Sequence, residues 1–162
     1  MIDTNSELRL YEAKMIHHYD HRWLSFNKNN PERELSLDRD NPNALVTPCY
    51  YVKEKIVIDR IGSDWKRKWL IGWRDITNTT NERTMIFSVL PFEALSNTLP
   101  LALLVYNKPW LLPPILSSYV ADYCVRQKMG GTHLTMNYLR QVAVLTPSTF
   151  NKSIYIYIVI KR

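Results

Sequence analysis

The chain has 162 residues, of which 46% are hydrophobic and 22% charged, so we expect one globular domain with a sizeable core. Its apolar runs are shorter than the roughly 18 residues of a membrane helix, and the first residues lack the apolar centre of a signal peptide. These two absences predict no membrane partner. The two cysteines, Cys49 and Cys124, lie far apart in sequence, which disfavours a zinc site and favours a reduced, cytoplasmic protein.

The positive charge is concentrated in the C-terminal third. The net charge of the whole chain is +6, and residues 101–162 contain seven Lys and Arg but a single acid, Asp122. An electrostatic field of that sign favours polyanionic partners, with nucleic acid first and an anionic membrane second.

In the first part of the chain, residues 10–26 alternate partially and are predicted to form a strand that enters and leaves a turn. Residues 27–48 contain two Asn-Pro steps and a Thr-Pro step amid dense charge. These signals predict a long surface loop or insertion, with one helical turn at residues 32–37. Residues 50–61 fit either a strand or a short helix.

Two strands are predicted around a polar loop in the middle of the chain. The first strand alternates, with Trp69, Ile71 and Trp73 on one face, and these aromatic rings are expected in the core or on a sheet face. Residues 84–91 form the second strand, which ends at a proline. The loop between them, residues 77–83, is rich in hydroxyls and amides.

One helix is predicted over residues 115–129, behind a Pro-Pro pair that suits a first helical turn. Its apolar stripe, at three- and four-residue spacing, consists of Ile115, Leu116, Tyr119, Val120, Tyr123 and Cys124. The remaining predicted elements are a buried strand at 101–106, a short helix at 134–140, a strand at 141–147 and a strand at 154–160.

The segment that most strongly suggests a function runs from Val125 to His133 and reads VRQKMGGTH. Gly130 and Gly131 can adopt positive φ and allow the backbone to approach a ligand, while Arg126 and Lys128 add cationic charge. A basic glycine loop with exposed N–H groups suits a phosphate backbone. The alternative is a helix C-cap whose cations compensate the helix dipole.

Other polar residues have the chemistry of DNA contacts, because cations, hydroxyls and amides bind phosphates and base edges. Each could instead belong to a solvated turn. The full candidate DNA-binding set is Lys14, His17, His21, Arg22, Arg74, Thr77, Thr80, Arg83, Arg126, Lys128, Gly130, Gly131, Thr132 and His133.

Catalytic signatures are lacking in the sequence. It contains no glycine-rich nucleotide loop, no Gly-x-Ser-x-Gly motif and no paired-cysteine metal site, so we assign no catalytic or metal-binding residue. A free-standing metal-dependent nuclease that uses His17, His21 and His133 is an alternative. A polar segment whose imidazoles form ordinary hydrogen bonds accounts for the same residues.

Three ordered segments carry a resemblance to a known family: YEAKMIHHYDHRW at 11–23, WLIGWRDITNTTNERTMIFSVLP at 69–91 and LSSYVADYCVRQKMGGTHLTMNYLRQVAVLTP at 116–147. They resemble the C-terminal target-recognition region of type II (type IIG-like) restriction-modification adenine-N6 DNA methyltransferases, which include methylases of phage defence. The order of helix, glycines and strand is also similar to the recognition domains of type I specificity subunits. The resemblance covers most of the chain except the loop at 27–48 and the tail.

The resemblance implies an α/β or α+β fold, with a curved mixed β-sheet and a few helices at one side. It also implies sequence-specific recognition of double-stranded DNA, on behalf of a methyltransferase domain in the same parent polypeptide. The family's methyl-donor and catalytic motifs are missing, and Ala13 stands where the family usually has glycine.

We therefore expect residues 1–162 to be a single target-recognition domain and a fragment of a larger methyltransferase. The chain is expected to have no cofactor and no activity of its own, while the parent protein uses S-adenosylmethionine. A protein-interaction domain that docks on the methyltransferase is a further alternative.

Overall fold

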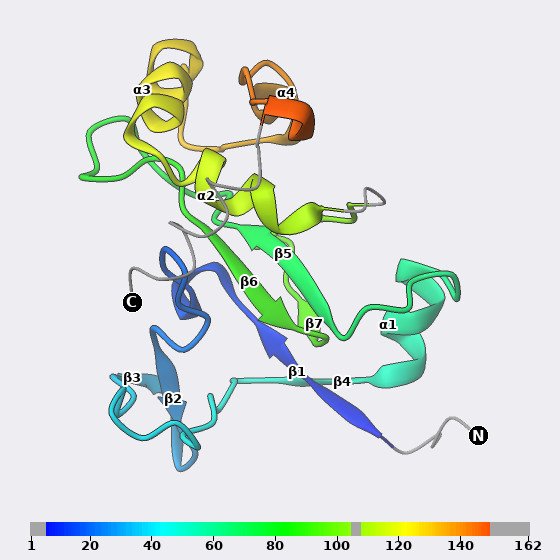
Figure 1. Cartoon of the computed structure of the whole chain (residues 1–162). Helices are drawn as coiled ribbons and strands as arrows, with labels where there is room; N and C mark the ends of the chain where they lie inside the picture. Colours follow the sequence, from blue (N-terminus) through cyan, green and yellow to red (C-terminus); the bar gives the residue numbers. More distant parts are fainter. Residues whose placement is uncertain (1–5, 105–107, 150–162) are drawn as a thin grey trace.

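The computed structural model describes residues 6–104 and 108–149. Within these ranges the fold is α+β, with four α-helices and eight short strands (Figure 1). The expected mixture of helices and strands is confirmed. The strands form three small sheets, of three, two and three strands, where one curved sheet was expected.

The first sheet is mixed. Its central strand β1 (Glu7–Tyr11) pairs antiparallel with β4 (Tyr51–Lys53) and parallel with β7 (Ala94–Leu95). Helix α1 (Glu54–Ile61) follows β4 without a break, so the segment that fitted a strand or a helix forms both. A 3-10 turn, η1 (Ala13–Met15), follows β1.

The second sheet is a hairpin of β2 (Ser25–Asn27) and β3 (Asn30–Leu35). An irregular loop was predicted at residues 27–48, with a helical turn at 32–37. This prediction is wrong up to Leu35, where the chain forms the hairpin. Cross-strand pairing of Phe26 with Glu34 supplies the backbone hydrogen bonds that the local proline and charge pattern did not predict. The rest of the segment up to residue 48 has no regular structure.

The third sheet has β5 (Trp69–Trp73) at its centre, antiparallel to β6 (Phe87–Pro91) and to β8 (Leu101–Ala102). The two strands predicted around the polar loop are confirmed. Of the strand predicted at 101–106, Leu101 and Ala102 pair with β5, residues 103 and 104 are not in a strand, and residues 105 and 106 lie outside the described ranges.

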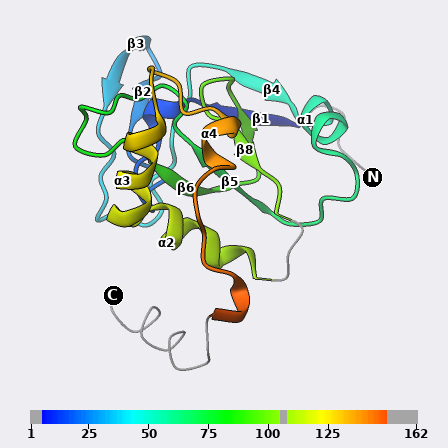
Figure 2. The same ribbon diagram turned by 90° about the horizontal axis from the view of Figure 1, so that it is seen from above.

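Three helices gather at one side of the molecule, while α1 lies apart from them (Figure 2). They are α2 (Leu112–Leu116), α3 (Tyr119–Lys128) and α4 (Met136–Leu139). Short 3-10 turns precede α2 (η2, Pro109–Leu111) and follow α4 (η3, Pro147–Thr149). None of the helices in the described ranges has the length and apolar character that a bilayer crossing requires.

The single helix predicted at 115–129 is interrupted at Ser118. Its hydroxyl accepts a hydrogen bond from the Ala121 N–H and starts a new helix, as serine does at an N-cap. The break turns the α3 part of the predicted apolar stripe outwards, so Tyr119 is 77% and Val120 74% exposed, while Leu116 of α2 stays buried. On α3, Val125 is buried instead.

The three predictions for the C-terminal part of the chain have different outcomes. The short helix after the glycines is confirmed as α4. Residues 141–146 form no strand. The N–H groups of Gln141 and Val142 donate instead to the carbonyls of Tyr138 and Leu139, at the end of α4. The strand predicted at 154–160 lies outside the described residues.

The core has two clusters. The larger one joins β5 and β6 to the helices and centres on Trp73, whose ring stacks on Phe87 at a centroid distance of 5.7 Å. The Trp73 indole N–H donates to the Leu134 carbonyl at 2.8 Å. The second cluster packs β1, η1 and β2 together around Tyr11, Met15 and Phe26.

Candidate nucleic-acid interface

The polar loop after β5 and the segment after α3 lie side by side, although they are about fifty residues apart in sequence. The Thr77 N–H donates to the Thr132 carbonyl at 3.0 Å, and Ile76 forms an antiparallel bridge with His133. The Leu134 N–H continues the pairing to the Asp75 carbonyl at 2.7 Å. We call residues 77–83 and 126–133 together the loop surface.

A buried carboxylate, that of Asp122, holds the polar loop on α3. Its Oδ1 accepts the backbone N–H groups of Thr84 at 2.9 Å and Met85 at 2.7 Å. Its Oδ2 accepts the Arg126 Nε–H at 2.8 Å, and the Arg83 Nε lies 3.7 Å from Oδ1. Asp122, which is the one acid in residues 101–162, therefore anchors the polar loop. Sequence reasoning missed it, although its isolation among cations was a usable signal.

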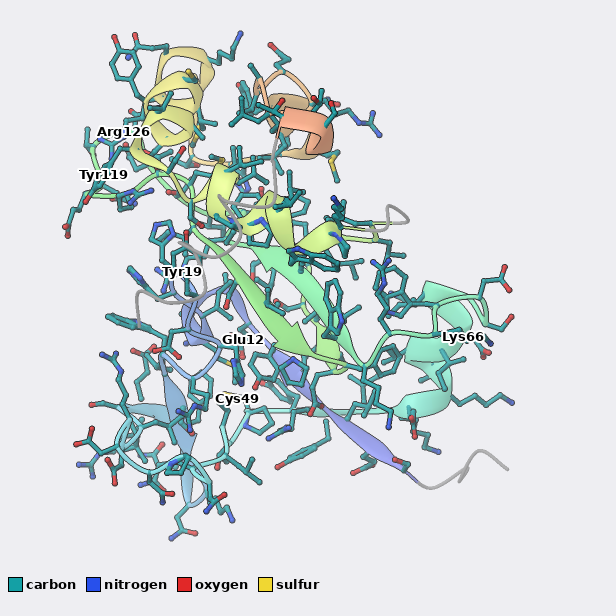
Figure 3. All side chains as sticks on the ribbon, viewed as in Figure 1. Glu12, Tyr19, Cys49, Lys66, Tyr119 and Arg126 are labelled. Carbon is teal, nitrogen blue, oxygen red and sulfur yellow. The ribbon has the colours of Figure 1, made fainter. Side chains whose placement is uncertain are left out.

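The two arginines of the loop surface bind their own chain. Arg126 donates to the carbonyls of Thr79 at 3.2 Å, Asn81 at 2.7 Å and Glu82 at 2.6 Å. Arg83 donates to a carbonyl in the break before α3, and its guanidinium lies 4.4 Å from the centre of the Tyr119 ring. Figure 3 shows Arg126 and Tyr119 at the same edge of the molecule. These cations make the loop rigid, and their charge still contributes to the field around it.

Three other candidate cations also have partners within the protein. The Arg74 guanidinium donates through Nε to the Ile16 carbonyl at 3.0 Å, and burial lowers its pKa. Arg22 donates to three carbonyls of residues 41–44, which ties down the segment after β3. The Lys14 ammonium lies 3.1 Å from the Glu34 carboxylate. The structure therefore does not bring these three into the loop surface.

The candidate histidines are held in two separate places. The His17 ring packs on Trp23 at a centroid distance of 4.2 Å, and burial lowers the pKa of both His17 and His21. The His133 Nδ1 lies 2.8 Å from the Asp75 carboxylate. Within the described residues, no three His, Cys, Asp or Glu side chains gather as a metal site would require. The ligand set of the nuclease alternative is therefore not assembled.

His18, which lies near Arg83 of the loop surface, has an unusual buried ring. Both of its ring nitrogens are buried without a hydrogen-bond partner in the described part of the chain, and the next residue, Tyr19, has a φ of 59°. Burial, followed by the nearby positive charge of Arg83, lowers the pKa of His18 to about 4.

This shift predicts that the protein loses stability in acid. An unfolded chain protonates His18 near its ordinary pKa of 6.5, whereas the folded protein resists protonation until about pH 4. The free energy of unfolding should therefore fall as the pH decreases from about 6.5 to about 4, by about 1–2 kcal/mol because water screens part of the effect. Urea denaturation at a series of pH values measures this loss. His18→Phe should flatten the slope, and an unchanged slope would contradict the assignment.

Most residues of the loop surface face solvent, but the two threonines of the polar loop that were predicted to contact DNA differ in exposure. The hydroxyl of Thr80 is exposed and bonded to the Asn78 side chain at 3.0 Å, whereas Thr77 is buried and donates to the Thr84 carbonyl. Lys128 is exposed, and no partner for its ammonium lies within the described residues.

The two glycines differ from expectation. Gly62 is the one glycine with positive φ in the described ranges, so Gly130 and Gly131 do not adopt it. The helix ends instead through an extended Met129, with φ of −82° and ψ of 117°. A Cβ built at either glycine meets nothing within 4 Å. Open space therefore surrounds this stretch of backbone, as close approach of a ligand would require.

No family model, curated protein or solved structure matches the chain, so the geometry of the loop surface is the basis for a functional proposal.

Proposed function

We propose that the chain recognises double-stranded DNA as the target-recognition module of a restriction-modification methyltransferase, and that it is not catalytic alone. The observation that carries this proposal is the loop surface. A loop rich in hydroxyls and amides lies against a basic helix end, and the buried Asp122 carboxylate holds the two together. A rigid polar loop beside free cationic charge is the combination that reading a duplex needs.

The loop surface divides into two kinds of contact. Asn78 and Thr80 are exposed at the tip of the polar loop and have the donors and acceptors that read base edges. Lys128 and the backbone N–H of Gly131 suit phosphates, which fix register without carrying sequence information. The Gly130 N–H makes a long hydrogen bond of 3.5 Å to the Tyr138 hydroxyl, which a phosphate oxygen would replace. In this proposal Arg83 and Arg126 position the loop and add to the positive field.

The partner is double-stranded DNA together with a methyltransferase domain of the parent polypeptide. That domain would supply the catalytic groups and bind S-adenosylmethionine. A protein of this kind would work in the cytoplasm.

A second candidate function rests on the exposed apolar face of α3. Tyr119, Val120 and Tyr123 face solvent, and a hollow of about 500 Å³ lies beside them, between α3 and residues 143–145. An apolar face of this kind is typical of a docking surface, in this case for the methyltransferase domain.

Lys128→Ala tests the DNA-binding proposal. Loss of one phosphate contact should weaken binding about equally on all duplexes and lower the salt slope by roughly one unit. Fluorescence anisotropy with two duplexes of unrelated sequence, at several salt concentrations, measures both quantities.

Lys55→Ala is the matched control, because Lys55 is exposed on α1, away from the loop surface (Figure 1). It should leave the slope unchanged. If Lys128→Ala also leaves affinity and slope unchanged, the loop is a helix terminus, and docking through the apolar face of α3 becomes the better explanation.

A further inference from the structure

A hollow of about 680 Å³ lies on a different part of the molecule, between α1 and the segment that leads into β5. In Figure 3, Lys66 marks this place beside α1, well away from Arg126 and Tyr119. Its size falls in the range of small-ligand sites. The residues that matter for its chemistry are Ile58, Trp65, Lys66, Lys68 and Phe92.

The hollow combines an apolar floor with a cationic rim. Leu8, Ile58 and Phe92 supply the apolar part, while Lys66 and Lys68 supply ammonium groups. Arg67 and one acid, Glu54, also line the hollow, so its cations outnumber its acids. The Lys66 ammonium donates to the Ser63 carbonyl at 2.7 Å, which keeps it at the rim. Residues 53–68 contain six Lys and Arg against three acids, so the local field is positive. A ligand with a flat apolar part and a negative part matches this lining.

Trp65 adds an unpaired donor. Its indole Nε1 is buried and has no acceptor within the described residues, although buried polar groups in proteins almost always have one. The Arg67 guanidinium lies 5.2 Å from the ring centres of both Trp65 and Trp69 and donates to the Leu104 carbonyl. This stack fixes the Trp65 ring at the wall of the hollow, and the ring carries a donor that lacks an acceptor within the described residues.

We propose that this hollow binds a nucleotide, with the base against Trp65 and Phe92 and the phosphate at Lys66 and Lys68. Aromatic side chains stack on bases of any identity, and lysines neutralise the phosphate. The nucleotide comes either as a free mononucleotide or as one unit of a single strand, whose bases are unpaired. A duplex is unsuitable because its bases are stacked on one another. This site uses no residue of the loop surface, so it is independent of the proposed function.

Two probes test the site: adenosine monophosphate by calorimetry and a fluorescent ten-residue oligothymidine by anisotropy. Trp65→Phe keeps an aromatic ring but removes the N–H, and should weaken binding about fivefold. The double variant Lys66→Ala, Lys68→Ala should lower the salt slope for the oligonucleotide by roughly 1.4 units. Lys55→Ala removes one charge from α1 outside the hollow and should change neither quantity.

The binding results with the two probes distinguish a free mononucleotide from a nucleotide of a single strand. Binding of both probes supports a site for free nucleotides, and binding of the oligothymidine alone supports a unit of a single strand. Circular dichroism checks that each variant is folded. Failure of the folded wild type to bind either probe overturns the proposal, as does an equal loss in Lys55→Ala. Duplex binding should be unchanged in Trp65→Phe, which keeps this test separate from that of Lys128.

Discussion

Asp122→Ala should lower the free energy of unfolding by about 3–5 kcal/mol, because it removes one partner of a buried charged network. Two buried backbone N–H groups, of Thr84 and Met85, would lose their acceptor. The guanidinium of Arg126 would lose its carboxylate at the same time. Urea denaturation followed by far-ultraviolet circular dichroism measures the change.

Two comparison variants identify the cause. Asp122→Asn keeps a side-chain oxygen for the two N–H groups but loses the charge, so it should cost less than Asp122→Ala. Asp59→Ala removes an exposed carboxylate on α1 and should stay within about 0.5 kcal/mol of the wild type. Equal effects of Asp122→Ala and Asp59→Ala would show that the buried network does not hold the polar loop.

Trp73→Ala should lower the free energy of unfolding by about 3–5 kcal/mol, as large-to-small changes of buried aromatic residues do. Trp73 is 1% exposed, packs on Phe87 and donates its indole N–H to the Leu134 carbonyl. Its removal would leave a cavity between β5 and the helices and an unpaired carbonyl. The denaturation midpoint in urea reports the loss.

Trp110→Ala is the control, because Trp110 is 53% exposed and should cost about 1 kcal/mol or less. Trp73→Phe keeps most of the ring volume but loses the N–H donor, and its cost should lie between those of the two alanine variants. A smaller loss for Trp73→Ala than for Trp110→Ala would contradict the placement of the larger core cluster.

Some strands and helices could be predicted because the periodicity of their own residues indicates the structure. Alternation of Trp69, Ile71 and Trp73 predicted β5, and the apolar run before Pro91 predicted β6. In a helix the backbone hydrogen bonds join residues that are close in sequence. The helix α4 could therefore be predicted from a short stretch. The α+β class was implied by the family resemblance, and the structure confirms it.

Other elements depend on partners distant in sequence. The strand β3 exists because β2 pairs with it. Residues 141–146 form no strand, and their first two N–H groups donate back to carbonyls of α4. The second half of the predicted apolar stripe faces solvent because the break at Ser118 reorients α3, which then buries Asp122 and Val125 instead of Tyr119 and Val120.

The candidate site shows the same division. The sequence by itself determined which side chains carry cationic, hydroxyl and amide groups, because that chemistry belongs to each residue. Only the tertiary structure decided that Arg22, Arg74 and Arg126 donate to backbone carbonyls, because those carbonyls come from segments 19 to 58 residues away. It also left the Lys128 ammonium without a partner in the described part of the chain. The tertiary structure also placed the polar loop against residues 130–133, through hydrogen bonds between the two backbones that no local pattern specifies.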